Sequence, residues 1–147
     1  MIDNLFQDKI LAIGSRSKDG EVRHNHMEYY STEAAKWTIG SDYPYHTTIE
    51  AFEMVQHGDG FIVFGGIYEK SLYSYYTTAV IAKYDPVPNT WSKLGDLKKD
   101  RHAFGLIQLE DEYLIVGGQG DMKSEICRLK NDAMICSERE PTMTNFW

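Results

Sequence analysis

The sequence has few of the residues that build disulfide scaffolds, metal sites or nucleic-acid interfaces. Its 147 residues include two cysteines and four prolines, and 15 Lys and Arg stand against 22 Asp and Glu, a net charge of −7. Two cysteines are too few for a disulfide scaffold, and they lack the spaced His or Cys companions of a zinc motif. No dense basic cluster can neutralise a phosphate backbone, so we expect no nucleic-acid partner.

Long apolar segments and catalytic motifs are absent as well. No window approaches the roughly 18 apolar residues that a membrane helix needs, and the first eight residues lack the basic start and apolar stretch of a signal peptide. The sequence contains no Gly-rich phosphate loop ending in Lys, no Gly-x-Ser-x-Gly and no His-Glu-x-x-His. We therefore expect no membrane insertion, no cofactor and no catalytic activity.

Aromatic residues, in contrast, are abundant. Ten Tyr, six Phe and three Trp lie among short β-branched runs, such as residues 61–64 and 113–116, that are bounded by Gly and Asp. Such runs are typical of short strands joined by tight turns. No stretch of helical length keeps an apolar stripe with a period of 3.6 residues, so the sequence predicts an all-β fold. A hydrophobic content of 42% is enough to build its core.

Two segments of the chain match each other at an offset of 52 residues without a gap. The matched stretches are residues 51–56 with 103–108, residues 61–64 with 113–116, and Gly65-Gly66 with Gly117-Gly118. A weaker third copy lies upstream, where residues 10–15 fit the same frame with Ser15 in place of the second glycine. This self-similarity predicts a repeat protein with a period near 50 residues.

Each unit is expected to form two hairpins, and therefore a four-stranded antiparallel sheet. In the second unit the expected strands are residues 51–57, 61–66, 79–85 and 90–95. A double glycine that ends an inner strand permits positive φ angles where backbones crowd together. Tyr84 and Trp91 are equally distant from the turn between them, so we expect an aromatic cross-strand pair. The corresponding positions are Tyr30 and Trp37 in the first unit, and Leu129 and Cys136 in the third.

These landmarks resemble the kelch motif, in which a double glycine after an apolar strand is followed by Tyr-Asp, Trp and an Arg-His start to the next unit. They are present here as Gly65-Gly66, Tyr84-Asp85, Trp91, Arg101-His102 and Gly117-Gly118. The resemblance implies a β-propeller, with blades at about residues 1–40, 49–96 and 101–138. Propellers close with about 4–8 blades, so we expect this chain to be part of an incomplete ring. Further blades of a longer parent chain, the alternative we favour, or several copies of the chain would complete it.

The same resemblance implies a non-catalytic interaction module that presents a loop face to a partner protein or peptide. That face is formed by the loops at about 15–25, 67–78 and 119–124 and by the links at 41–50 and 96–101. Its candidate binding residues are Arg16, Arg23, Tyr43, Tyr45, His46, Tyr68, Tyr73, Tyr75 and Tyr76. Clustered tyrosines supply rigid amphipathic surface, although alternate tyrosines could equally extend a hairpin and pack on neighbouring blades. Arg101, with Lys98 and Lys99, either adds positive charge that suits an acidic peptide or braces a blade boundary.

Two further groups of residues admit a functional and a structural interpretation. His24 and His26 point to one face of a strand and, with a distant His46, suit a metal ion, but no carboxylate is tied to them by spacing, so we favour a solvated strand face. Cys127 and Cys136 flank the outer hairpin of the third unit and are expected to lie diagonally, as ordinary buried thiols. The sequence leaves the compartment open, with a lean toward the cytoplasm; a bond between the two cysteines would indicate an extracellular protein.

Two alternative functions follow from the resemblance. The first is a secreted or surface propeller for adhesion or carbohydrate binding. The second is part of a propeller enzyme similar to galactose oxidase, although no matching set of tyrosine and histidine metal ligands can be placed in this sequence.

Overall fold

The computed structural model describes residues 2–6, 9–16, 23–71, 74–119 and 123–139. Over these residues the chain forms antiparallel β-sheets, none of which closes on itself, and the predicted all-β fold is confirmed. The described part of the chain contains no helix long and apolar enough to cross a membrane.

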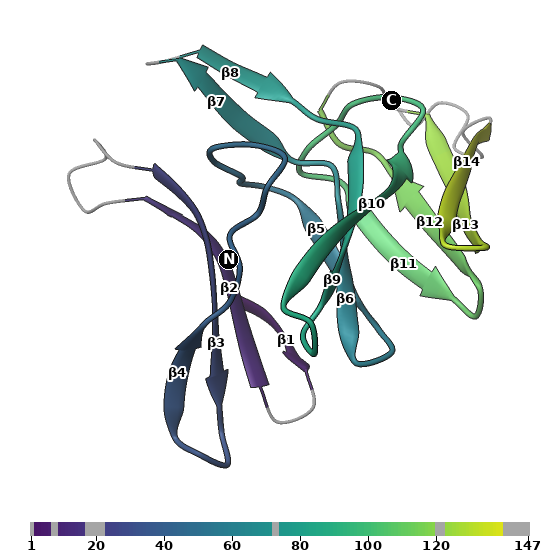
Figure 1. The fold of residues 1–147 in the computed structure, drawn as a ribbon. Helices are drawn as coiled ribbons and strands as arrows, with labels where there is room; N and C mark the ends of the chain where they lie inside the picture. Colours follow the sequence, from purple (N-terminus) through teal and green to yellow (C-terminus); the bar gives the residue numbers. More distant parts are fainter. Residues whose placement is uncertain (1, 7–8, 17–22, 72–73, 120–122, 140–147) are drawn as a thin grey trace, which may run out of the picture.

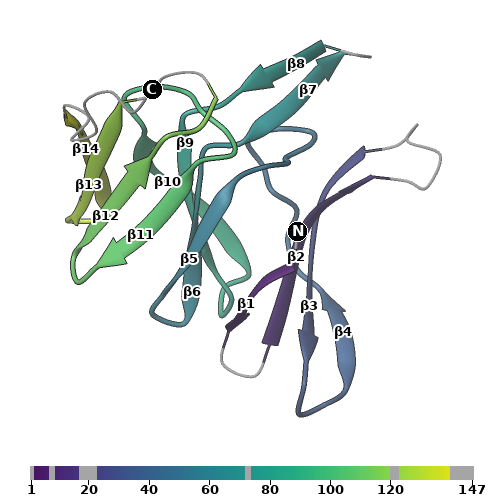
Figure 2. The ribbon, with the colours of Figure 1, turned by 180° about the vertical axis from the view of Figure 1, so that it is seen from behind.

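Three four-stranded sheets follow one another along the chain. Sheet 1 contains β1 (Ile2–Phe6), β2 (Lys9–Arg16), β3 (Arg23–Ser31) and β4 (Lys36–Ile39). Sheet 2 contains β5 (Glu53–His57), β6 (Gly60–Phe64), β9 (Val80–Asp85) and β10 (Thr90–Asp96). Sheet 3 contains β11 (Gly105–Leu109), β12 (Glu112–Val116), β13 (Ser124–Lys130) and β14 (Ala133–Arg139). In each sheet the strands lie side by side in chain order, and a separate hairpin of β7 (Ile67–Ser71) and β8 (Ser74–Thr77) interrupts sheet 2. The sheets stand next to one another with sheet 2 in the middle (Figures 1 and 2).

The strands of sheet 2 lie where the sequence predicts them, to within two residues at each end. The first strand begins at Glu53 because Ala51, with a φ of +50°, has a left-handed backbone that cannot continue a strand. Ala103, at the corresponding position before sheet 3, has the same conformation with a φ of +51°. The repeat seen in the sequence is thus also a repeat of backbone conformation.

The double glycines act as predicted at the end of the inner strand. Gly65 and Gly66 have φ angles of +55° and +117°, and the Gly66 amide donates a hydrogen bond to the carbonyl of Arg101, at 2.9 Å. A Cβ atom on Gly65 would lie 2.6 Å from that same carbonyl oxygen. Glycine is therefore required at this position both by its backbone conformation and by the close approach of the segment that leads into sheet 3.

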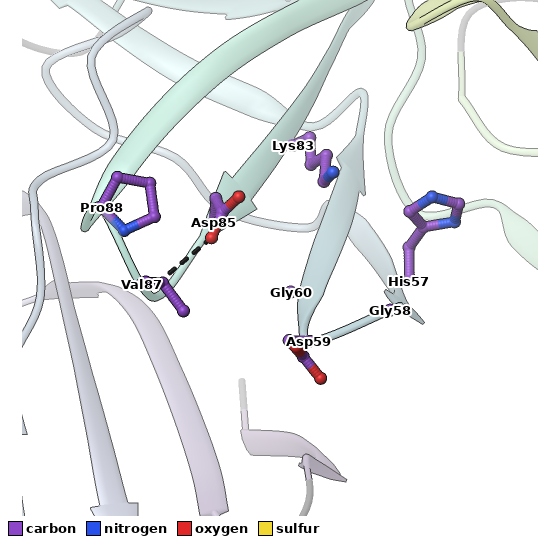
Figure 3. Close-up of a pocket in the computed structure, with 8 residues that line it drawn as sticks. All are labelled: His57, Gly58, Asp59, Gly60, Lys83, Asp85, Val87 and Pro88. Atoms are coloured by element: carbon purple, nitrogen blue, oxygen red, sulfur yellow. Dashed lines mark hydrogen bonds between the residues drawn. The ribbon is translucent and has the colours of Figure 1, made fainter.

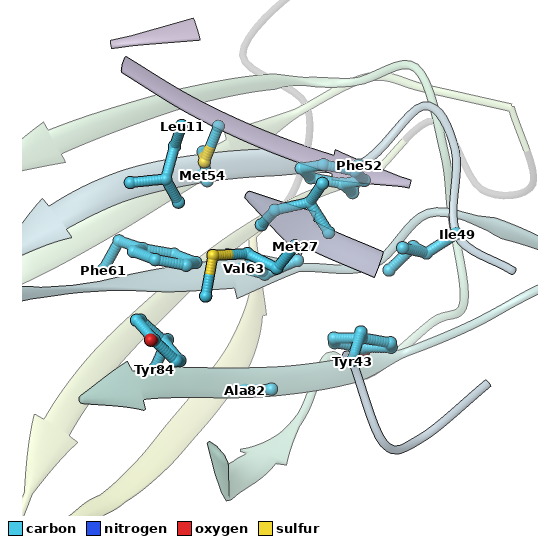
Figure 4. Close-up of a cluster of buried hydrophobic side chains, with 11 residues drawn as sticks. Leu11, Met27, Tyr43, Ile49, Phe52, Met54, Phe61, Val63, Ala82 and Tyr84 are labelled. Atoms are coloured by element: carbon cyan, nitrogen blue, oxygen red, sulfur yellow. The ribbon is translucent and has the colours of Figure 1, made fainter. Parts of the chain in front are cut away.

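Two apolar clusters hold the sheets together. The first lies between sheets 1 and 2 and the second between sheets 2 and 3. Figure 4 shows side chains of the first cluster, with contributions from Leu11, Met27, Tyr43, Ile49, Phe52, Met54, Phe61, Val63, Ala82 and Tyr84. Because successive residues of a strand point to opposite faces, sheet 2 supplies one face to each cluster.

The predicted aromatic cross-strand pairs are present in the first two sheets. Tyr84 lies opposite Trp91, and Tyr30 lies opposite Trp37, with ring centroids 5.2 and 5.4 Å apart. The Trp91 indole also donates a hydrogen bond to the carbonyl of Ser41, at 2.9 Å, in the link from sheet 1. The pair in sheet 2 therefore packs this sheet on its neighbour, as its residue types suggested.

In sheet 3 a disulfide occupies the position of the aromatic pair, and both predictions for the two cysteines were wrong. Cys127 and Cys136 lie directly opposite each other and are bonded. Cys127 also pairs with Tyr113 of β12, as Tyr84 pairs with Phe61 in sheet 2. Leu129 is therefore not the counterpart of Tyr84.

The physical reason is the length of the turn. In sheet 2 four residues lie between Asp85 and Thr90, the pair nearest to the turn of the outer hairpin. In sheet 3 Asn131 and Asp132 alone connect β13 to β14. Both have positive φ, +49° and +59°, the conformation that two-residue hairpin turns require. A shorter turn with longer strands changes the spacing of opposed residues, so the spacing taken from the first two units does not hold in the third.

A fully buried ion pair joins the link before sheet 3 to β13. The Arg101 guanidinium donates a hydrogen bond to Glu125, at 2.7 Å, and two more to the carbonyls of Gly117 and Lys123. The Glu125 carboxylate also accepts hydrogen bonds from the backbone amides of Lys98 and Lys99. Of the two roles considered for Arg101, the bracing one is therefore correct, and this side chain adds no positive charge to the surface.

Candidate partner-binding face

The tyrosine-rich segment that the sequence placed in a loop forms the β7–β8 hairpin. This hairpin projects beyond the end of sheet 2 (Figure 1). Tyr68 lies opposite Tyr76, and Glu69 lies opposite Tyr75, so the tyrosines occupy both faces of the hairpin. Tyr75 and Tyr76 are 42% and 48% exposed. Tyr73 falls outside the described residues.

Backbone and side-chain contacts fix the base of this hairpin to both neighbouring links. Glu50 and Ile67 exchange two backbone hydrogen bonds, of 2.8 and 2.9 Å. The Thr48 hydroxyl accepts a hydrogen bond from the Glu69 amide at 2.8 Å, and the Thr77 hydroxyl donates to the Asp100 carboxylate. The hairpin is thus held at its base from the link between sheets 1 and 2 and from the link between sheets 2 and 3.

His46 joins the hairpin to the link through an aromatic stack. Its ring lies parallel to that of Tyr68, with centroids 3.9 Å apart, and its Nε2 atom is 2.8 Å from the Thr78 hydroxyl. Burial lowers the pKa of His46. Tyr68 in turn contacts Tyr76, with ring centroids 5.9 Å apart, and the Lys70 ammonium lies 5.6 Å from the Tyr76 ring centroid. These residues form a continuous row, which we call the aromatic row, defined as His46, Tyr68 and Tyr76.

The two tyrosines of the link have different positions. Tyr43 is fully buried, and its ring packs edge-on against Trp91 at 5.1 Å, so it belongs to the core and cannot contact a partner. Burial, with smaller contributions from Tyr45 and Asp96, raises its pKa. Tyr45 is partly buried beside it, and burial raises its pKa also. The prediction that Tyr43 lies on the binding face is therefore corrected by its packing.

The basic candidates do not form a cluster on this face. Arg16 and Arg23 form the last backbone pair of the β2–β3 hairpin, and their side chains lie outside the described residues. The side chains of Lys98 and Lys99 are exposed, although their amides bind Glu125. With Arg101 buried, the described side chains give no support to a concentrated positive surface.

The three histidines considered for a metal site make separate contacts. The rings of His24 and His26 stack at 4.8 Å, and the Nδ1 atom of His26 is 2.7 Å from the Asp42 carboxylate. His46 lies against Tyr68. Among the described residues, the one group of three potential metal ligands is Glu125 with Cys127 and Cys136, and the disulfide occupies both sulfur atoms.

An open hollow lies at the opposite end of sheet 2, between its two turns (Figure 3). Its lining residues are His57, Gly58, Asp59, Gly60, Lys83, Asp85, Val87 and Pro88. The Asp85 carboxylate accepts a hydrogen bond from the Val87 amide at 3.2 Å, which stabilises the turn. His57 contacts the Tyr113 hydroxyl of sheet 3 at 3.2 Å, and burial, followed by the charge of Lys83, lowers its pKa. The polar groups of this hollow thus serve the turns and the contact between sheets.

Sequence reasoning proposed His46, Tyr68 and Tyr76 as candidates but not the residues that position them. Thr48, Thr78 and Asp100 hold the hairpin and His46, and none was a candidate. Thr48 and Thr78 are buried, and each is the second residue of a Thr-Thr pair that flanks the tyrosine-rich segment. Those paired threonines are the signal that could have marked the ends of an anchored hairpin.

Comparison with known proteins gives information on the fold of the chain. No family model matches the chain. The solved structure of YjhT is similar to this chain over 88% of its length, with a TM-score of 0.72 and 16% sequence identity. The match covers 42% of YjhT, so the chain spans less than half of that protein. At this level of identity the likeness is evidence of a shared fold alone.

Proposed function

We propose that this chain is part of a kelch-type β-propeller and that its β7–β8 hairpin binds a partner protein or peptide without catalysis. Three consecutive four-stranded sheets, each with its strands in chain order, support the propeller arrangement. The double glycines and the Tyr84–Trp91 pair support the kelch assignment, because they occupy equivalent places in successive sheets. The absence of catalytic motifs from the sequence supports a binding role.

The aromatic row is the observation that carries the binding role. A free surface hairpin would lose conformational entropy when it binds, whereas this one is fixed at its base by four hydrogen bonds before a partner arrives. Its outer end, Tyr76, is half exposed and lies beside the Lys70 ammonium. Rigid, exposed tyrosines next to a cation are typical of hot spots for protein and peptide ligands.

A peptide-display selection on the immobilised chain tests this role. Selected peptides would be synthesised, and their affinity measured by fluorescence anisotropy for the unmodified chain and for Tyr76→Ala. We expect the variant to bind about 30-fold more weakly, the effect of losing roughly 2 kcal/mol at a hot spot. Val87→Ala is the matched control, because Val87 is 85% exposed at the far end of sheet 2. Equal binding by Tyr76→Ala would exclude the hairpin as the site.

We propose further that the protein works in an oxidising compartment, which favours the secreted alternative over a cytoplasmic one. The support is the bonded pair of Cys127 and Cys136, which are directly opposed and buried. Disulfides persist in oxidising compartments and are rare in the cytosol. Intact-mass measurement after thiol blocking of protein from its native source tests this: the bonded chain stays unmodified, whereas blocking groups on both cysteines would contradict the proposal.

A further inference from the structure

The outer face of sheet 3 is rich in apolar side chains, and no described segment packs on it. Tyr113 and Cys127 point toward sheet 2, and the alternate residues of the same strands point away from it. On that outer face Ile107 and Ile135 are 51% and 58% exposed. Its aliphatic members are Ile107, Leu109, Leu114, Val116, Ile126 and Ile135. An apolar face of this extent indicates an interaction surface.

At the centre of this face the charges neutralise each other, and Lys130 and Arg139 lie at its two margins. Glu112 and Arg128 are neighbours in one row of the sheet, and the Arg128 Nε atom donates a hydrogen bond to the Glu112 carboxylate at 2.6 Å. Leu109 and Ile135 lie at the two ends of the same row. A partner for this face therefore needs apolar surface more than a charge of either sign.

The repeat identifies the kind of surface that fits there. Ile107 and Leu114 correspond, at the offset of 52, to Val55 and Ile62, which pack against sheet 3 in the second core cluster. Leu11 of sheet 1 occupies the same position and packs against sheet 2. At both existing interfaces this aliphatic face is thus covered by the opposite face of the next sheet.

Sheet 1 presents a face of that opposite kind, and within the described part of the chain nothing packs on it. Tyr30 and Trp37 form the pair that corresponds to Tyr84 and Trp91, yet Trp37 is 48% exposed, whereas Trp91 packs against the first core cluster. Ile39, on the same face, is 74% exposed. The outer faces of sheets 3 and 1 are therefore of the same two kinds that pack together between sheets 1 and 2 and between sheets 2 and 3.

Gly117 differs from its counterpart Gly65 in its surroundings, as far as the described residues show them. A Cβ atom on Gly65 would lie 2.6 Å from the carbonyl of Arg101, in the segment that covers the end of sheet 2. Gly117 is the counterpart of Gly65, with a φ of +70°, but no atom lies within 4 Å of the corresponding position among the described residues. Among the described residues, no segment takes at Gly117 the place that the Arg101 segment takes at Gly65.

The sequence alone favoured further blades of a longer parent chain, but one chain presents both complementary faces. We infer that a second copy of this chain covers the outer face of sheet 3 with the outer face of its own sheet 1. Applied twice, the contact closes two copies into a ring of six sheets, within the range of about 4–8 blades for propellers. The inference shares the propeller arrangement with the proposed function but uses no residue of the hairpin.

The mass of the purified chain in solution tests the inference. Sedimentation velocity over a range of concentrations should give a species of twice the 16.9 kDa chain mass. Ile107→Lys on sheet 3 and Trp37→Glu on sheet 1 should each lower the mass to that of one chain. Val87→Lys, at an exposed turn remote from both faces, should leave the pair intact. Ile135→Lys serves as a second sheet 3 variant, and circular dichroism identifies any variant that does not fold.

Mixing the two variants tests the direction of the contact. Ile107→Lys retains an intact sheet 1 face and Trp37→Glu an intact sheet 3 face, so a mixture should regain a two-chain species that neither variant forms alone. A pair that tolerates Trp37→Glu but not Ile107→Lys would indicate contact between two sheet 3 faces, and would overturn the inference. A single-chain mass for the unmodified protein at every concentration, or open-ended polymers, would overturn it too. Either result leaves the Tyr76 binding test unaffected.

Discussion

Replacing Gly65 by alanine should destabilise the chain considerably more than the same change at Gly117. Both glycines end an inner strand with similar left-handed φ angles, +55° and +70°. They differ in their surroundings: a Cβ atom at Gly65 would lie 2.6 Å from the Arg101 carbonyl oxygen, whereas none of the described atoms lies within 4 Å at Gly117. The pair therefore separates the effect of backbone conformation from that of steric overlap.

The magnitudes follow from these two terms. A left-handed backbone costs alanine about 1–2 kcal/mol, partly offset by roughly 0.4–1 kcal/mol from the stiffer unfolded chain, and both effects apply equally at the two sites. At Gly65 the overlap with the carbonyl adds about 1–3 kcal/mol, the usual range for overpacking a close-packed site. We expect Gly65→Ala to lose about 2–4 kcal/mol and Gly117→Ala about 1 kcal/mol.

Urea denaturation followed by tryptophan fluorescence measures both variants, at one protein concentration so that any association affects them equally. The midpoint of Gly65→Ala should fall much further than that of Gly117→Ala, with the m-value unchanged. Equal losses would refute the reasoning, because they would show that the φ angle alone requires glycine and that the approach of the Arg101 carbonyl is unimportant.

Three further predictions concern buried or partly buried groups. Arg101→Leu should cost about 3–5 kcal/mol in urea denaturation, since it leaves the buried Glu125 carboxylate without its partner. Glu125→Gln should also be destabilising, because a glutamine keeps one acceptor oxygen where the carboxylate uses Oε2 for the Lys98 amide and Oε1 for the Lys99 amide and Arg101, and an unchanged midpoint would contradict this account. The folded pKa of His46 lies below its ordinary value, so the unfolded chain binds more protons and stability should fall as the pH drops from about 7.5 to about 5.5. His46→Phe should show a smaller fall over that interval, and an unchanged fall would assign the effect to other groups. Replacing both Cys127 and Cys136 by alanine should lower the free energy of unfolding by about 2–3 kcal/mol, the loop-entropy value for two cysteines nine positions apart. A loss well below about 1 kcal/mol would argue against a stabilising bond.

Features that depend on local pattern were predictable from the sequence. The strands of sheet 2 follow from short apolar runs between turn residues, and the double glycine marks a backbone that other residues cannot adopt. The opposition of Tyr84 and Trp91 follows from their equal distance to a turn of ordinary length. These are properties of neighbouring residues, and the repeat reinforced each of them.

Features that depend on distant segments were not predictable. Whether a tyrosine of the link lies on the surface is decided by what packs over it, and Trp91, 48 residues away, covers Tyr43. The β7–β8 hairpin forms against the link at Thr48, which no pattern within the segment itself could show. Residue type alone thus proposed His46 and the hairpin tyrosines as candidates, and their arrangement comes from contacts with the two links.

The sequence by itself determined the period, the strands and the positions that require glycine, because a short stretch of chain contains the steric and hydrophobic information for each. Only the tertiary structure decided which cysteine faces which and whether Arg101 is a surface charge or a buried brace. A two-residue turn changed the register that pairs Cys127 with Cys136, and the side-chain hydrogen bonds of Arg101 all lead to residues 16 to 24 positions away. Local sequence determines strands and turns, whereas register and long-range hydrogen bonds are determined only when the strands assemble into sheets.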